Sequence, residues 1–229
     1  MVRKNLHTCR FLRVLQLRLM MKTYETELPN GYVETKVIDV KDKKFGIIMN
    51  VVAIAVLIIT LVITWFILFA QFDESFSEIL LNRILVFDAL TMLLRVVIFM
   101  AAMIAYIVLH ELTHGAVYKA LTKQKLTFGL TLTAAYCGVP NIYVYRTTAL
   151  LSLLAPFCVF FPVFLVPMFF LNNYLDVLLF AFMFGMHVGG CSGDLYDTFL
   201  YLFKYRDPST LMRDYGPKQI FYVKTQNED

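Results

Sequence analysis

The sequence predicts an all-α membrane protein with about four transmembrane helices and a small β-hairpin or re-entrant insert between the second and the third. Of its 229 residues, 59% are hydrophobic and only 17% are charged, whereas about a quarter of a soluble domain is charged. Two apolar segments of bilayer-spanning length contain no charged residue at all. Lipid is therefore the expected solvent for much of the chain, and little length is left for a separate soluble module.

The four expected spans follow one another along the chain. The first covers residues 45–72, and the second covers about 84–109 and runs into residues 110–114 without a Gly or Pro. The third and fourth cover residues 149–171 and 174–191. Each approaches or exceeds the roughly 20 residues that a helix needs to cross the hydrocarbon core.

Charged residues and prolines interrupt two of these spans. Asp88 and Arg95 are seven residues apart, on a similar helical face, and we expect a buried ion pair or snorkelling side chains there. The third span contains prolines at positions 156, 162 and 167, which are expected to kink it.

Residues 126–148 have a different composition from the spans. They are rich in Thr, Tyr and Val, alternate in part, and are broken by a turn signal at residues 138–141. This pattern predicts the hairpin or re-entrant element. Residues 29–40 and 220–223 are also strand-like.

The sequence divides into a cytosolic N-terminal segment (1–44), a membrane-embedded domain (45–198) and a cytosolic tail (199–229). Residues 1–20 hold neither a span nor a catalytic group. We therefore expect a chain that starts at Met21 to remain active.

Basic residues predict the orientation in the membrane. If the N-terminus is cytosolic, segments 1–44, 115–148 and 199–229 hold 19 of the 21 Lys and Arg residues. The positive-inside rule favours this arrangement. The expected location is the cell membrane, with several spans and both termini in the cytosol. The net charge of +4 then reflects contact with a lipid bilayer, and no nucleic-acid partner is expected.

The His110-Glu111-Leu112-Thr113-His114 segment predicts a zinc site with hydrolytic chemistry. On a helix, His110 and His114 share a face and can present imidazole nitrogens to one Zn²⁺. Glu111 would lie beside the metal, where it can take a proton from water and later give it to a leaving amine. The four cysteines show no paired spacing, so neither a disulfide framework nor a structural zinc ribbon is expected.

A catalytic zinc needs a third protein ligand. The best remaining donors are Asp194, Asp197 and His187, near the end of the fourth span, and Cys191 is a weaker one. The glycines at positions 189, 190 and 193 are expected to let this segment pack closely against the helix that carries His110 and His114. His187 would lie about 10 Å deeper than Asp194 if one helix connects them. We favour Asp194 as the ligand and His187 as a residue that supports the ligands, with His187 as the alternative ligand.

Several motifs resemble the site-2 protease group of intramembrane metalloproteases. They are the HELTH segment, the strand-like insert after it, Ala155-Pro156 in the next span and Gly193-Asp194 at the end of the last. The chain is most similar to the small bacterial branch of that group, the zincin peptidases, through Glu27–Tyr32, His187–Asp197 and Asp214-Tyr215-Gly216. The resemblance extends over nearly all of residues 25–224.

This resemblance implies His110, His114 and Asp194 as zinc ligands and Glu111 as the catalytic acid and base. Site-2 proteases usually carry Asn-Pro shortly before the ligand Asp, where this chain has Cys191-Ser192-Gly193.

Three functions compete. The first is a membrane-embedded zinc metalloprotease that cuts membrane-protein or peptide substrates near the cytosolic face, with residues 126–148 holding an extended substrate by edge pairing. The second is a non-catalytic zinc-binding protein that acts as an accessory or scaffold factor, although such a protein does not need Glu111. The third, a metal transporter, is disfavoured because the spans offer almost no donors near the membrane midplane.

The predicted topology can be tested by labelling single cysteines at positions 76, 122 and 226 with a membrane-impermeant reagent. Position 76 should react from outside intact cells, since it lies between the first two spans. Positions 122 and 226 should react only after the cells are opened. Labelling of either of these from outside would overturn the four-span arrangement with cytosolic termini.

Overall fold

The computed structural model describes residues 22–72, 89–131, 134–171 and 174–225. The expected dispensable segment 1–20 and Asp88 lie outside the described residues. The helices of the structure are α2 (Lys43–Phe72), α4 (Ala89–Thr122), α5 (Arg146–Leu165), the 3₁₀ helix η2 (Val166–Phe169), α6 (Tyr174–Gly190) and α7 (Ser192–Phe203). Its strands are β1 (Tyr24–Glu25), β2 (Tyr32–Asp39), β3 (Thr127–Leu130), β4 (Ala135–Gly138), β5 (Tyr143–Tyr145), β6 (Leu211–Asp214) and β7 (Lys218–Lys224).

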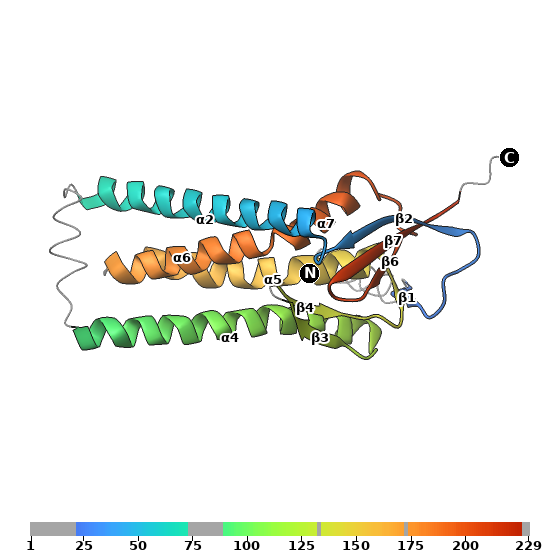
Figure 1. Cartoon of the computed structure of the whole chain (residues 1–229), viewed down its shortest axis with the longest axis horizontal. Coiled ribbons are helices and arrows are strands. Elements are labelled where there is room, and N and C mark those ends of the chain that lie inside the picture. Colours follow the sequence, from blue (N-terminus) through green and yellow to red (C-terminus); the bar gives the residue numbers. More distant parts are fainter. Residues whose placement is uncertain (1–21, 73–88, 132–133, 172–173, 226–229) are drawn as a thin grey trace, which may run out of the picture.

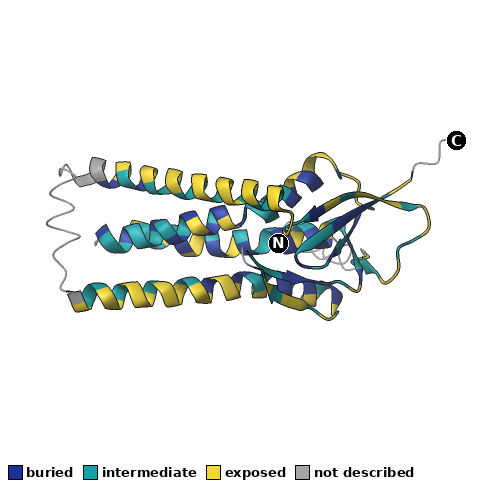
Figure 2. Cartoon of the chain, in the orientation of Figure 1, coloured by how far each residue is buried: buried dark blue, intermediate teal, exposed yellow. Residues whose placement is uncertain are grey.

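The long helices lie side by side (Figure 1), and many of their large apolar side chains are exposed. Three of them, α2, α4 and α5 with η2, are long and apolar enough to cross a membrane. The pair α6 and α7 passes the same test jointly, although it bends by 43° at the break between the two helices. Figure 2 shows exposed residues along the outer faces of α2 and α4, as expected where lipid replaces water. The described helices are thus consistent with a membrane protein, and the four-span arrangement stays a prediction.

Helix ends follow local sequence signals. The Asp42 carboxylate accepts a hydrogen bond of 2.8 Å from the backbone N–H of Phe45, which caps the first turn of α2. Helix α4 continues past His114 to Thr122 and is followed by Lys123 with a φ of 58°. Pro156 and Pro162 lie within α5, and Pro167 lies in η2.

A five-stranded antiparallel sheet covers one end of the helices (Figure 1), and the description as an all-α protein missed it. Its strand order is β1-β5-β6-β7-β2, so the N-terminal strand β2 pairs with the C-terminal strand β7. Strands β2 and β7 were foreseen as isolated strand-like segments. The sheet arises because its strands come from three distant parts of the chain, a pairing that periodicity cannot show.

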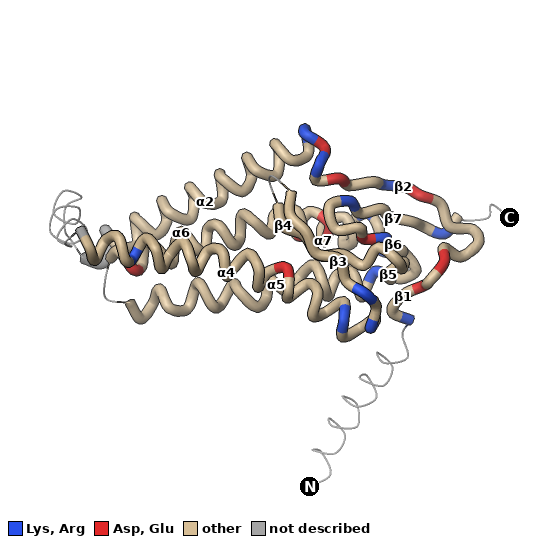
Figure 3. Tube along the Cα trace, turned by 60° about the horizontal axis from the view of Figure 1, so that its bottom comes forward, with Lys and Arg blue, Asp and Glu red and all other residues tan. Residues whose placement is uncertain are grey.

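The sheet and the helix ends share one hydrophobic core. Tyr118 of α4, Ala149 of α5 and Tyr201 of α7 are buried together with Met212 and Phe221 of the sheet. Most charged residues of the described chain lie at this end of the molecule, as Figure 3 shows. The apolar helices and the charged sheet end thus occupy opposite parts of the structure.

Strands β3 and β4 form a separate antiparallel pair between α4 and α5. The pair packs directly on α4. A Cβ atom at Gly115 would lie only 2.8 Å from the ring of Phe128 and 3.3 Å from the Cys137 sulfur. Since Gly115 follows His114, this close packing puts the β3–β4 pair next to the HELTH segment.

The glycines near Asp194 do not pack against α4 as expected. A Cβ at Gly189 would lie 2.7 Å from the carbonyl oxygen of Ala53 in α2, whereas Gly190 and Gly193 face open space. The expectation was wrong because α6 packs mainly on α2, so the small-residue surface serves that contact. Arg95 forms an ion pair with Asp176 of α6, which gives this intramembrane charge a partner on a neighbouring helix.

Gly189→Ala should destabilise the protein because the added methyl group cannot fit against the backbone of α2. Overpacking of this kind costs about 1–3 kcal/mol, and the midpoint of thermal unfolding in detergent should fall. Gly190→Ala is the matched control, since its methyl group meets no atom within 4 Å and Ala favours helix over Gly by about 1 kcal/mol. Equal midpoints for the two variants would contradict the α2–α6 contact.

Candidate metal centre

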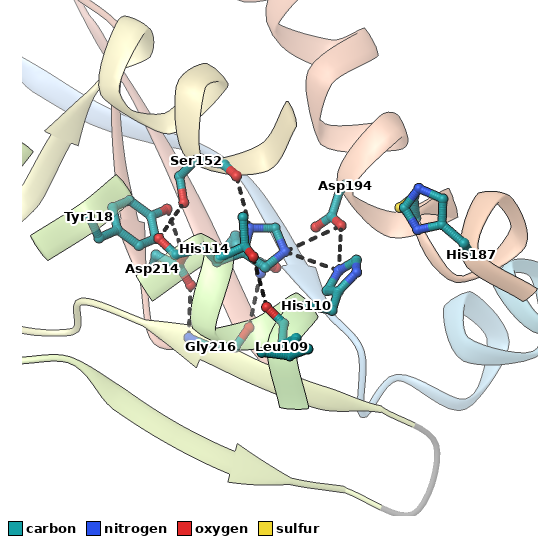
Figure 4. A network of polar contacts seen from close by, with 12 residues as sticks. Leu109, His110, His114, Tyr118, Ser152, His187, Asp194, Asp214 and Gly216 are labelled. Carbon is teal, nitrogen blue, oxygen red and sulfur yellow. Dashed lines mark hydrogen bonds and ion pairs between the residues drawn. The ribbon is translucent and has the colours of Figure 1, made fainter. Parts of the chain in front are cut away.

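His110 and His114 of α4 lie next to Asp194 of α7, as Figure 4 shows. The Nε2 atoms of the two histidines are 3.2 Å apart. The Oδ2 atom of Asp194 is 3.4 Å from each of them. Asp194 is in the first turn of α7, where the positive end of the helix dipole favours a carboxylate.

These three atoms fit a tetrahedral zinc site. Zinc binds His nitrogen and carboxylate oxygen at about 2.0–2.2 Å, so two ligands of a tetrahedron are separated by about 3.3–3.5 Å. The observed separations of 3.2 and 3.4 Å match this edge length. Two imidazoles and one carboxylate also form a known catalytic zinc set, with a fourth position left open.

The orientation of His114 is fixed from α5. Its Nδ1–H donates to the carbonyl oxygen of Ser152 at 2.9 Å, and the Ser152 hydroxyl donates to the carbonyl of His114 at 3.3 Å. A neutral imidazole with its proton on Nδ1 keeps a lone pair on Nε2. The lone pair on Nε2 of His114 is therefore available to bind a metal, and this atom faces His110 and Asp194. Sequence reasoning did not identify Ser152, because a backbone carbonyl partner leaves no residue-type signal.

Glu111 lines the same cavity but is not part of the ligand group. The cavity has a volume of about 140 Å³ and includes His110, Glu111, His114 and Asp194 in its wall. A backbone hydrogen bond from Cys137 of β4 reaches the Glu111 carboxylate. Burial, with Asp214 and Glu111 nearby, raises the pKa of the Cys137 thiol to about 12. That thiol therefore stays protonated and is a poor metal ligand.

Asp214 is a second polar residue of this region that sequence reasoning did not assign a role. It comes from β6, is 4% exposed, and also lines the cavity. Its carboxylate accepts hydrogen bonds of 2.8 Å from the Tyr118 hydroxyl and from the Gly216 backbone N–H. Burial raises the pKa of Asp214 to about 6, although these two donors oppose the shift. The one available signal was the position of Tyr118, four residues after His114 and so on the same helical face.

His187 and Asp197 lie outside the group formed by His110, His114 and Asp194. His187 is fully buried, and its Nδ1 atom is 2.9 Å from the Tyr106 hydroxyl. His187 belongs to a different potential ligand group with His110 and Cys191. His187 and Asp194 do not share one helix, as the expected depth difference of about 10 Å required, because α6 ends at Gly190 and α7 starts at Ser192. Asp197 is buried one helical turn beyond Asp194 and lies in the cavity wall.

Residues 103–209 match the family model described as "Putative zincin peptidase". Over these residues the chain is similar to the zincin peptidase family. The match confirms the family that the sequence motifs suggested, and it indicates a zinc metallopeptidase. It includes the three candidate ligands and Glu111, and it ends before Asp214. No curated protein and no solved structure matches the chain.

The geometry predicts different effects for two substitutions at this centre. Asp194→Ala should lower zinc affinity much more than His187→Ala, because Asp194 contributes a ligand atom and a negative charge. His187→Ala should cost only a factor of about 10–100, as expected of a residue that supports a ligand. Zinc content of the purified variants over a chelator series measures both. A zinc-free His187→Ala protein beside a zinc-loaded Asp194→Ala protein would indicate a three-histidine site.

Proposed function

We propose that the chain is a membrane-embedded zinc metalloprotease that hydrolyses peptide bonds near the cytosolic face of the membrane. The observation that supports this most directly is the triangle of donor atoms with sides of 3.2 and 3.4 Å beside Glu111. His110, Glu111 and His114 lie on α4, which is apolar enough to cross a bilayer, and Asp194 lies on α7, which passes this test only together with α6. The proposed relation to site-2 proteases rests on the motif order in the sequence.

In this proposal, His110, His114 and Asp194 hold Zn²⁺, and Glu111 handles protons. When bound, zinc supplies a Lewis acid that polarises the scissile carbonyl and makes a nearby water more acidic. Glu111 takes the proton of the attacking water and delivers it to the leaving amine. The Cys137 backbone hydrogen bond holds the Glu111 carboxylate toward the cavity. Ser152 keeps the His114 ring in the orientation that directs Nε2 to the metal.

Strand β4 is the proposed binding edge for the substrate. Ala134, Ala135, Tyr136 and Cys137 line the cavity, and β4 pairs with β3 on one side. An extended peptide that pairs with the other side of β4 at Ala135 and Tyr136, before Cys137 whose backbone already bonds Glu111, would place its backbone along the cavity. A helical substrate would have to unwind, because a helix keeps its carbonyls in internal hydrogen bonds. The substrate class is therefore a membrane protein or peptide with a segment that can become extended.

The position of the cavity favours cleavage near the membrane surface. Its wall contains Ile38 and Val40, from β2 and the residue after it, together with Gly216 and Gln219 from the β6–β7 hairpin. These lining residues put the cavity at the junction of the apolar helices and the sheet, and Figure 1 shows how the two parts meet. Most Lys and Arg residues of the described chain lie at the sheet end (Figure 3), and this supports a cytosolic location for that end under the positive-inside rule.

Glu111→Gln should abolish proteolysis and leave zinc content near that of the wild type, because Glu111 moves protons and is not a ligand. Loss of general acid–base catalysis costs about 10²–10⁴-fold in rate. The measurement compares N-terminal peptides from membranes that contain wild-type or Glu111→Gln protein, together with zinc content. Glu34→Gln, on the exposed part of β2, is the matched control and should keep full activity.

Two other outcomes would change the proposal. Loss of zinc together with activity would make Glu111 a metal ligand. A zinc-loaded wild type that produces no Glu111-dependent peptides would favour the alternative function, a non-catalytic accessory or scaffold protein.

A further inference from the structure

The Tyr106 hydroxyl bridges two buried histidines. It is 3.3 Å from Nδ1 of His110 and 2.9 Å from Nδ1 of His187. Tyr106 lies one helical turn before His110 on α4, whereas His187 comes from α6. The hydroxyl therefore connects a candidate zinc ligand with a histidine that is outside the ligand group.

We propose that Tyr106 and His187 are positioning residues that fix the tautomer and ring orientation of His110. This inference rests on the zinc site proposed above. In that site His110 binds through Nε2, because this atom faces His114 and Asp194. The Nδ1 atom then carries the proton, since a neutral imidazole has one donor nitrogen and one acceptor nitrogen.

The direction of each hydrogen bond in the chain follows from this tautomer. His110 Nδ1–H donates to the Tyr106 oxygen, so the Tyr106 O–H is free to donate to His187. The Nδ1 atom of His187 must then be the acceptor, and its proton must be on Nε2. The Nε2 atom of His187 is buried and has no hydrogen-bond partner among the described residues, although the Phe157 backbone interacts electrostatically with this ring. His187 is thus expected in the opposite tautomer to His110 and His114.

Aromatic packing restricts this arrangement. The Tyr106 ring is 8% exposed and makes edge-to-face contacts with Phe160 and Phe164. The His187 ring is 0% exposed and stacks on Phe157 at a centroid distance of 5.9 Å. A hydroxyl in such surroundings has little access to water, so its hydrogen bonds to the two histidines are not easily replaced.

The second potential ligand group, formed by His110, His187 and Cys191, is the competing interpretation. The Nδ1 atom of His187 is 3.7 Å from the Cys191 sulfur, but the same atom is the partner of the Tyr106 hydroxyl at 2.9 Å. A metal bound there through Nδ1 would have to displace this hydrogen bond. The positioning role requires no such change.

Nitrogen NMR of the full chain in detergent, labelled with ¹⁵N only at histidine, tests the proposal. The chain has four histidines, and His7→Gln and His187→Gln variants assign two of the signals. In zinc-loaded protein, His110 and His114 should carry the proton on Nδ1, and His187 should carry it on Nε2. A proton on Nδ1 of His187 would overturn the proposal.

Tyr106→Phe removes only the hydroxyl and should change the His187 signals and lower zinc affinity by about 10–100-fold. Tyr205→Phe is the matched control. Tyr205 is also buried, its hydroxyl has no hydrogen-bond partner among the described residues, and it packs on Phe221 of the sheet. An unchanged His187 tautomer and unchanged zinc affinity in Tyr106→Phe would reject the positioning role.

Zinc binding by the wild type and by two further variants distinguishes a failure of the positioning role from a failure of the proposed function. If zinc affinity depends on Cys191 and not on Asp194, as Cys191→Ser and Asp194→Ala would show, the metal is in the competing group and the inference is wrong. If the wild type binds no zinc, the proposed function fails. The tautomer of His187 and its response to Tyr106→Phe still decide whether the hydrogen-bond chain exists.

Discussion

The meeting of α4 and α7 at the three donor atoms is the contact on which the rest of the structure depends. A carboxylate in a poorly solvated place is costly unless charged or hydrogen-bonding partners compensate for it. Asp194 has the imidazoles of His110 and His114 within 3.4 Å, and a bound cation would add to this compensation. The requirement sets where the first turn of α7 must lie. The break after Gly190 and the close contact of Gly189 with α2 then place α6 so that α7 can reach this position.

The sheet completes the site from the other side. Asp214 of β6 binds the Tyr118 hydroxyl of α4, and the adjacent turn approaches β4 so closely that a Cβ at Gly138 would lie 2.4 Å from the Gly216 nitrogen. A Cβ at Gly216, which has a φ of 89°, would lie 2.2 Å from the Tyr136 ring. These contacts tie the C-terminal hairpin, the β3–β4 pair and the helix that carries HELTH into one unit. The cavity wall therefore contains residues from the N-terminal part of the described chain, such as Ile38, and from its C-terminal part, such as Gly216.

The outer surface of the helices is apolar, whereas the interior near the candidate ligands contains hydrogen-bonded polar groups. The outer faces of α2 and α4 expose large apolar side chains, which is favourable only where lipid covers them. Inside, polar groups are joined in short hydrogen-bond chains, such as His114 with Ser152 and Tyr106 with His110 and His187. With little water available, each buried polar atom needs a partner within the protein. In these chains the partners that orient His110 and His114 are a hydroxyl and a backbone carbonyl, and neither is a charged side chain.

The sequence by itself determined the apolar helices, the spacing of His110 and His114, and the similarity to the zincin peptidase family. Hydropathy, i, i+4 spacing and short motifs are local properties of the chain. The sequence also singled out Asp194, whose role as a ligand stays a proposal supported by the donor distances. Only the tertiary structure decided that β2 pairs with β7, that Gly189 packs on α2, and that Asp214 lies beside Tyr118. It also separated His187 from Asp194 by a helix break and joined it to Tyr106. These features depend on contacts between distant segments and on backbone partners, and residue type and spacing alone do not encode them.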